Sequence, residues 1–235
     1  MNRLYTALQL KQLYRLKELG FEYTDLTQIE MGVEDSEIFD LPDNLEALKE
    51  IVSGCTLCDL SKTRTKVVFG EGKKDADLMF VGEGPGATED STGRPFVGQA
   101  GRLLEEIIKD TLLISRTEYY IANIVKCRPP KNRVPTPGEA LSCSPYLLKQ
   151  IEIIKPKIII SLGGTAYRYL TQDTTPISRV RGSFLDMGDF LLMPTFHPSY
   201  LLRNRTKKRF VYDDLLKVKK LLEQISENKE SMNLL

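Results

Sequence analysis

The sequence predicts an α/β fold: a three-layer α/β/α sandwich around a central, mostly parallel four-stranded sheet, with an N-terminal helical extension. Two observations predict it. Four short apolar runs, each typical of a buried strand, alternate with longer segments of helical pattern. Strands that alternate with helices form parallel sheets covered on both faces. The second observation is length, because 235 residues suffice for one such domain with a small appendage.

The first 45 residues are expected to form a helical extension and linker (residues 1–45). Leucines recur through residues 4–19 with lysine and arginine between them, which indicates an amphipathic helix that ends at Gly20. The acidic stretch from Glu30 to Asp43 indicates a linker. The main domain is expected over residues 46–226, with a flexible tail over residues 227–235. The extension is a candidate contact for a replication or repair partner.

Within the main domain, Asp43 is expected to cap a first helix that runs through Ile51. Pro137 suits the first turn of a later helix. The remaining elements are expected as strands at 78–81, 119–125, 157–162 and 190–193, and as helices at 99–109, 137–154, from 163 onward, and at 207–226. Sites in such sheets lie beyond the carboxyl ends of the strands. The loops that follow the first, second and fourth strands should therefore converge on one site.

Composition limits the compartment and the partners. The N-terminus has no apolar core of signal-peptide type, and no run approaches 18 consecutive apolar residues, so a cytoplasmic protein without a membrane contact is expected. Net charge is +1, so global charge does not indicate nucleic acid. Two local clusters, residues 126–133 and 203–209, are dense in lysine and arginine and are interpreted as phosphate contacts. We expect a monomer.

Four cysteines, Cys55, Cys58, Cys127 and Cys143, have the spacing C-x2-C-x68-C-x15-C. Thiolates suit zinc and iron–sulfur clusters, and four of them complete either site. The spacing favours a cluster, because the second pair of a zinc ribbon is usually another tight C-x2-C. Two disulfides or four buried thiols are the alternatives, and a reducing cytoplasm disfavours disulfides.

Three further features are candidates for chemistry. The loop at 82–98 holds five glycines in seventeen residues, together with Glu83, Glu89 and Phe96. Glycines let the backbone approach a ligand, although the order matches neither a dinucleotide-binding nor a Walker loop. His197 is the only histidine and follows the fourth strand. Asn123, on the second strand, carries an amide suited to an imide or amide edge.

These motifs carry a resemblance. The strings GEGPGATEDSTGRPFVGQAGRLL, NIVKCRPPKNRVPTP and MPTFHPSYLLRN, together with the four cysteines, resemble the family 4 uracil-DNA glycosylases, an iron–sulfur-containing branch of that superfamily. The resemblance extends from about residue 47 to residue 220. It implies a uracil-DNA glycosylase-like fold and a [4Fe–4S] cluster bound by the four cysteines in a structural role.

The resemblance also implies a reaction and a pocket. The enzyme would flip uracil out of single- or double-stranded DNA and hydrolyse its N-glycosidic bond, leaving an abasic site in base excision repair. Uracil would stack on Phe96 beside Gly84, Asn123 would bond its Watson–Crick edge, and His197 would bond O2. The better-known uracil glycosylases carry aspartate where this chain has Gly84. The acid that orients water is therefore open, with Glu83 the first choice and Glu89 the second.

The segment after His197 resembles the superfamily's intercalating loop. Leu201 is interpreted as the wedge that fills the gap left by the flipped base, with Tyr200, Arg203, Lys207 and Lys208 as further DNA contacts. The alternative is that the residues around Leu201 belong to the core at a helix start. Two other functions stay open: a non-catalytic iron–sulfur DNA-binding module associated with replication or repair, and a zinc-stapled nucleotide-binding protein.

Overall fold

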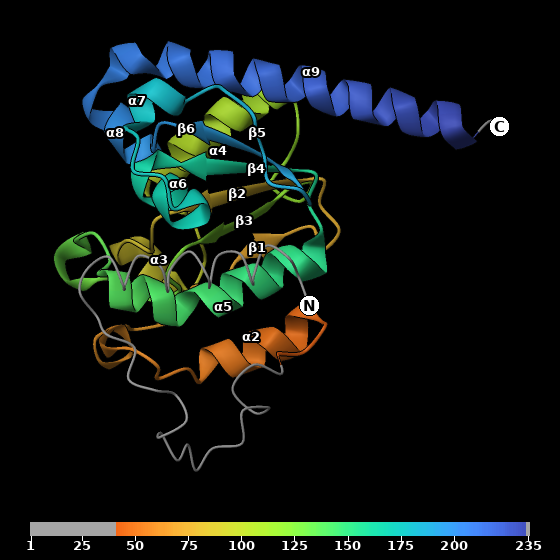
Figure 1. The fold of residues 1–235 in the computed structure, drawn as a ribbon. Coiled ribbons are helices and arrows are strands. Elements are labelled where there is room, and N and C mark those ends of the chain that lie inside the picture. Colours follow the sequence, from red (N-terminus) through yellow and green to blue (C-terminus); the bar gives the residue numbers. More distant parts are fainter. Residues whose placement is uncertain (1–40, 234–235) are drawn as a thin grey trace, which may run out of the picture.

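The structure is a computed structural model and describes residues 41–233 (Figure 1). The helix predicted over residues 4–19 lies outside the described residues. A six-stranded sheet forms the centre of the fold, in the order β1-β3-β2-β4-β6-β5. Its strands are β1 (Glu71–Gly72), β2 (Leu78–Gly82), β3 (Tyr120–Asn123), β4 (Ile158–Leu162), β5 (Leu185–Asp186) and β6 (Leu191–Thr195).

The four predicted strands are confirmed as β2, β3, β4 and β6, and they are mutually parallel. In register, Phe80 of β2 lies opposite Ile121 of β3 and Ile160 of β4. The predicted number of strands is wrong, because two strands of two residues each pair antiparallel at the outer edges. Such short strands contain no apolar run that a sequence pattern could reveal.

Helices cover both faces of the sheet, which confirms the three layers (Figure 1). One layer contains α2 (Leu45–Ser53), α5 (Pro137–Ile154) and α6 (Gly163–Thr171). The opposite layer contains α4 (Gln99–Leu112), α8 (Pro198–Arg203) and α9 (Lys208–Asn233). Shorter elements are α3 (Ala87–Thr92), α7 (Ile177–Val180) and the 3-10 turns η2 (Asp59–Lys62), η3 (Pro130–Asn132) and η4 (Arg205–Lys207).

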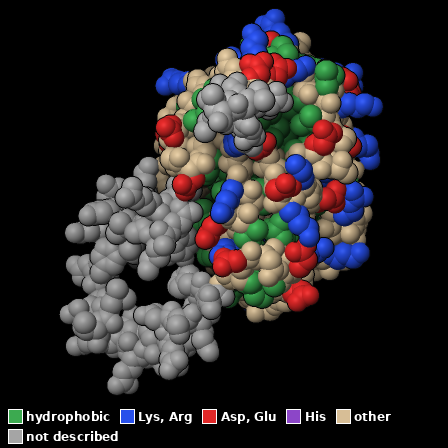
Figure 2. Space-filling view, turned by 90° about the vertical axis from the view of Figure 1, so that its right-hand side faces the viewer, with side chains coloured by type: hydrophobic (Ala, Val, Ile, Leu, Met, Phe, Trp, Pro, Cys, Tyr) green, Lys and Arg blue, Asp and Glu red, His purple; other side chains and the backbone are tan. Residues whose placement is uncertain are grey.

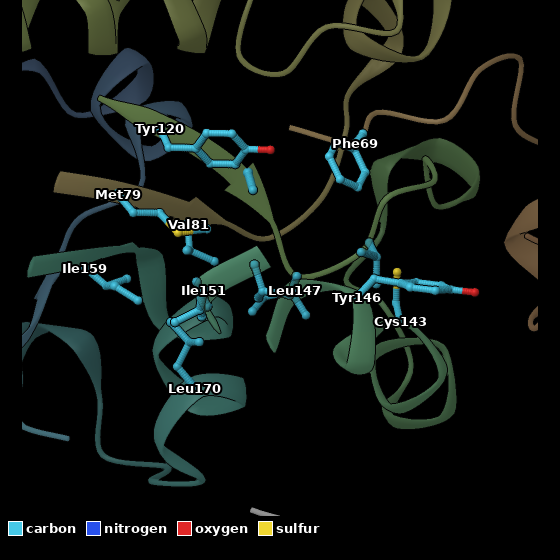
Figure 3. Packing of buried hydrophobic residues seen from close by; sticks show 14 of the residues in the cluster. Phe69, Met79, Val81, Tyr120, Cys143, Tyr146, Leu147, Ile151, Ile159 and Leu170 are labelled. Carbon is cyan, nitrogen blue, oxygen red and sulfur yellow. The ribbon is translucent and has the colours of Figure 1, made fainter. Parts of the chain in front are cut away.

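Strand β2 shows how the two cores form. All five of its residues are buried, as expected of a parallel strand covered on both faces. Because side chains alternate along a strand, Leu78 and Phe80 pack with α4 and α9, whereas Met79 and Val81 pack with α5 and α6. Figure 3 shows the second of these cores, in which Met79 and Val81 lie near Ile151 of α5.

The helix ends are set by local capping groups, with one correction to the predictions. Pro137 begins α5 as predicted, and Thr136 and Glu139 form a capping box there. The cap of α2 is Asn44 and not Asp43: Asn44 Oδ1 accepts a hydrogen bond from the Ala47 amide at 2.8 Å. Asp43 instead pairs with Lys149.

The last helix, α9, also differs from the prediction. It continues to Asn233, beyond the predicted end at residue 226, so residues 227–233 are helical where a loose tail was expected. Across the described part of the chain, no helix combines the length and the apolar character needed to cross a bilayer.

Candidate active site and cysteine centre

A pocket of about 550 Å³ lies at the carboxyl ends of the parallel strands. The glycine loop after β2, the segment after β3, the start of α6 and the His197 segment before α8 all contribute to its wall. In Figure 1, α6 and α8 mark this end of the sheet. The predicted convergence of three loops is confirmed, and the start of α6, with Gly163, Gly164 and Thr165, adds a fourth segment.

At the base of the pocket, the Phe96 ring and the Asn123 amide both lie close to Gly82. Asn123 is 1% exposed, and its Oδ1 has no hydrogen-bond partner among the described residues. A Cβ atom at Gly82 would lie 2.4 Å from Phe96 Cζ and 2.6 Å from Asn123 Oδ1. No real Cβ contact is that short, so only glycine lets the ring and the amide meet here. A buried acceptor left open in a pocket is suited to a ligand that carries a donor.

Phe96 is held in an uncommon backbone conformation. Its φ is +53°, in the left-handed region that few non-glycine residues adopt. Gly101 accommodates it, because a Cβ there would lie 2.0 Å from the Phe96 carbonyl carbon. The Phe96 ring lies 6.1 Å from the His197 ring, centre to centre, with an interplanar angle of 37°. The two rings therefore flank one space within the pocket.

The hydrogen bonds of His197 define which ring nitrogen carries the proton. The Ser199 backbone amide donates to Nδ1 at 3.1 Å, and the Ser199 hydroxyl lies 2.7 Å from the same atom. A backbone amide can only donate, so Nδ1 is the acceptor and the neutral ring carries its proton on Nε2. Burial, with a smaller contribution from Arg203, lowers the pKa of His197 to about 4. His197 is therefore a neutral donor at neutral pH.

The two candidate carboxylates differ in their surroundings. Both Glu83 and Glu89 line the pocket. Glu89 Oε1 accepts the amides of Val97 and Gly98 at 2.9 and 2.7 Å, and its Oε2 accepts the Gly86 amide at 3.1 Å. These bonds tie the two ends of the glycine loop together. Within the described residues, no hydrogen bond to the Glu83 carboxylate is found, so Glu83 is the acid left open toward the pocket.

Gly84 lines the same pocket, directly after Glu83. A Cβ at this position would lie 2.8 Å from Cγ2 of Val125. An aspartate side chain at Gly84 would therefore displace Val125, so the carboxylate found there in better-known uracil glycosylases does not fit this backbone without adjustment.

The four cysteines line one cavity between α2, η2 and α5, on the side of the sheet away from α4. All four are free thiols. Cys127 Sγ accepts a hydrogen bond from Arg64 Nη1 at 3.2 Å, and Cys143 Sγ accepts one from the Lys126 amide at 3.3 Å. Among the described residues, no three His, Cys, Asp or Glu side chains have the arrangement required by a single metal ion.

Lys126 connects this cavity to the pocket. Its side chain is 1% exposed, and its ammonium donates to the Asn123 carbonyl at 3.0 Å and to Gln150 Oε1 at 2.5 Å. Gln150 in turn donates to Phe69 O and Tyr120 Oη. Burial lowers the pKa of Lys126 to about 8, and the nearby Cys143 and Cys127 thiols oppose that shift.

Comparison with known proteins places this geometry in a family. The profile of the Uracil DNA glycosylase superfamily matches residues 69–217. The chain is 49% identical over 184 residues to a type-4 uracil-DNA glycosylase of Thermotoga maritima, covering 77% of this chain and 95% of that protein. It is 44% and 43% identical to the type-4 enzymes of Saccharolobus solfataricus and Sulfurisphaera tokodaii, covering 77% and 76% of this chain and 87% and 85% of those proteins. The chain belongs to the type-4 uracil-DNA glycosylases.

The predicted DNA contacts of this type-4 family member lie on and after α8. Tyr200 and Arg203 line the pocket. Lys207, the last residue of η4, and Lys208, the first of α9, are partly exposed, and Lys207 Nζ lies 5.2 Å from the centre of the Phe210 ring. Leu201, predicted as the wedge, is completely buried in the core with α4 and α9, as the alternative of a core residue at a helix start expects. Its neighbour Leu202 is 41% exposed.

Two features of this uracil-DNA glycosylase family member were not predicted from its sequence. Arg133 lines the pocket and binds Glu139 through two hydrogen bonds of 2.8 and 2.6 Å. The lysines and arginines of residues 126–133 marked this segment as a candidate phosphate contact. They did not reveal that Arg133 pairs with Glu139, which lies in the next helix. Lys126 belonged to the same basic cluster, and only the fold reveals that it is buried.

Proposed function

We propose that this chain removes uracil from DNA by hydrolysing the N-glycosidic bond, as the names of its type-4 relatives describe. The observation that carries the proposal is the open Oδ1 of Asn123 in a pocket between Phe96 and His197. Uracil presents an N3–H donor beside the O4 acceptor on its Watson–Crick edge. An amide oxygen and an amide nitrogen match that pair in order.

The same amide excludes cytosine. At the positions where uracil has N3–H and O4, cytosine has an acceptor at N3 and an amino donor at N4. Cytosine would therefore set an acceptor against Asn123 Oδ1 and a donor against the amide nitrogen, leaving buried groups unpaired. Unpaired buried polar groups typically discriminate strongly between analogues.

His197 supplies the charge stabilisation. Cleavage of the N-glycosidic bond leaves negative charge on the uracil and a cation-like sugar. The Nε2–H of the neutral His197 is suited to donate to O2 as that charge develops, and the bonds from Ser199 fix the ring before reaction. We propose that Glu83, whose carboxylate has no hydrogen bond from the described residues, orients the water and stabilises the sugar. Glu89 holds the loop on which Glu83 lies.

We propose that Cys55, Cys58, Cys127 and Cys143 hold a [4Fe–4S] cluster. Four free thiols around one cavity, with N–H donors from Arg64 and Lys126 directed at two sulfurs, are suited to a four-thiolate centre. When bound, the group supplies a covalent staple between the segment before β2 and helix α5. Unpaired thiols also support the expected cytoplasmic location. Iron and acid-labile sulfide at cube stoichiometry in anaerobically purified protein support the assignment, and stoichiometric zinc without iron contradicts it.

DNA binding is assigned to the basic side chains that follow the pocket. Arg203 lines the pocket, Lys207 and Lys208 follow it closely in the chain, and all three are suited to phosphates. Leu202, exposed on α8, replaces Leu201 as the proposed wedge. Figure 2 shows the face on the right of Figure 1, where lysines and arginines are interspersed with acids.

Incubation with a uracil-containing oligonucleotide, followed by alkali, tests the proposed function. We expect strand cleavage at the uracil by the wild-type chain and none by a double variant Asn123→Ala, His197→Ala that still binds DNA. Binding without cleavage by the wild-type chain would support the alternative, a non-catalytic module associated with replication or repair. Neutralising Lys207 and Lys208 should weaken binding and make its dependence on log salt shallower, by up to about one unit per lost phosphate contact.

We further propose that residues 46–226 form the glycosylase unit and that residues 1–45 contact a replication or repair partner. The family profile and all the site residues lie after residue 45, which supports the first part. Deletion of residues 1–40 should leave excision unchanged. A large loss of excision after that deletion would show that the extension belongs to the catalytic unit.

A further inference from the structure

Lys126 is a buried cation without a carboxylate partner among the described residues. Lys126 is 1% exposed, and its ammonium binds two neutral oxygens, the Asn123 carbonyl and Gln150 Oε1. Among the described residues, no carboxylate forms an ion pair with it. Burial of an unpaired charge is strongly destabilising, so buried charges are almost always matched by an opposite charge.

Lys126 lines the same cavity as the four cysteines, directly before Cys127 in the chain. Lys126 is also bonded to one of them through its backbone, because its amide donates to Cys143 Sγ. A four-thiolate centre carries net negative charge beside this cation. The charge of Lys126 is thus matched when the four thiols serve as ligands, and unmatched when they are neutral.

The same ammonium acts on the residue that binds the base. It donates to the main-chain carbonyl of Asn123, where β3 ends and the side-chain amide enters the pocket. The Lys126 carbonyl in turn accepts the Val68 amide at 2.8 Å, so the backbone of Lys126 is fixed from a third side. A short rigid path therefore leads from the cysteine centre to Asn123.

We infer that Lys126 is a positioning residue: its ammonium is the counter-charge of the four-thiolate centre and holds the Asn123 backbone where the amide meets uracil. The inference rests on the proposed function and cofactor. The cysteine centre then helps to position the amide that recognises the base, in addition to joining two segments of the chain. No redox step is involved.

The test compares Lys126→Met, which keeps the length and removes the charge, with two controls. Lys157→Met removes a cation at the other end of the sheet, where Lys157 Nζ pairs with Asp77 at 3.1 Å. Tyr120→Phe removes a hydroxyl from the same buried polar group without touching Asn123. Each variant is assayed for iron content, for the reduction potential of the cluster by protein-film voltammetry, and for single-turnover excision at saturating enzyme. If Lys126→Met does not fold, Lys126→Gln carries the same test.

We expect Lys126→Met to retain iron, to show a more negative potential because a nearby positive charge is gone, and to lose about 100-fold in excision rate because Asn123 is misplaced. Its DNA affinity and both controls should match the wild type. An unchanged potential, or an unchanged excision rate, would overturn the inference. Failure of the wild-type chain to excise uracil would instead refute the proposed function, and the potential of Lys126→Met would still decide whether the cation faces the cluster.

Discussion

The backbone amide of Ser199 donates to Nδ1 of His197 at 3.1 Å, and this one bond assigns the ring proton to Nε2. Since Ser199 follows His197 by two residues, at the start of α8, the helix itself sets the tautomer. A donor that needs no protonation to act is suited to a developing anion across the neutral pH range.

His197→Ala should therefore reduce the excision rate by about 100- to 1000-fold, the usual cost of one lost donor to a developing anion. Affinity for DNA should stay close to that of the wild type, because phosphate contacts position the duplex without chemistry. Single-turnover rates at saturating enzyme, measured beside affinities, separate the two effects. A variant that keeps its saturated rate and loses affinity would make His197 a structural residue of the DNA-binding segment.

The low pKa of His197, about 4, predicts a pH dependence of stability. Folding favours the neutral ring, so its contribution is present above the unfolded pKa near 6.5 and is lost as pH falls toward 4. The loss amounts to at most about 3 kcal/mol. Urea unfolding of wild type and His197→Gln at pH 7 and pH 4.5 measures it. The stability difference between the two proteins should shrink or reverse at the lower pH, and a constant difference would contradict the prediction.

Asn123→Ala should leave the uracil edge unpaired and cost about 1–3 kcal/mol in transition-state binding, measured as kcat/KM. Asn123→Asp provides the matched comparison, because the carboxylate accepts a hydrogen bond from the cytosine amino group. This variant should gain cytosine excision relative to the wild type. Excision of uracil by Asn123→Ala at the wild-type rate would show that this amide does not contact the base.

Gly82→Ala tests the contact between Phe96 and Asn123. The added methyl group has no room, so the variant should be destabilised by about 1–3 kcal/mol, the typical cost of overpacking, and should excise uracil slowly. Gly138→Ala is the control, since a Cβ there meets nothing within 4 Å and Gly138 does not line the pocket. Thermal unfolding and single-turnover assays of both variants give the answer. If the two variants have the same stability and excision rate, the residues around Gly82 can shift to accommodate the methyl group.

Leu202 and Leu201 provide a paired test of the wedge. Leu202→Ala should leave the stability of the fold nearly unchanged and slow excision from double-stranded DNA more than from single-stranded DNA, where no gap needs filling. Leu201→Ala should instead destabilise the protein by about 2–5 kcal/mol, as expected for a buried leucine. If only Leu201→Ala shows the strand-dependent loss, the α8 loop must rearrange on DNA to expose it.

The predictions from sequence succeeded where a pattern is local. The strands appeared as apolar runs, Pro137 marked a helix start, and the loops after the strands met at one pocket because parallel strands leave no other place for them. The burial of Leu201 could not be predicted from sequence. Two consecutive leucines at a helix start give the same pattern, and only packing against α4 decides which side chain turns inward. The burial of Lys126 was equally invisible, because a lysine in a basic cluster normally lies in solvent.

The two edge strands, β1 and β5, limit pairing between the sheets of different copies of this protein. Each presents only two residues at an outer border of the sheet and runs antiparallel to its neighbour. An intruding strand from another molecule would find too few free amides and carbonyls there for a stable ladder. Copies of this protein at high local concentration should therefore have little tendency to aggregate by pairing the edges of their sheets.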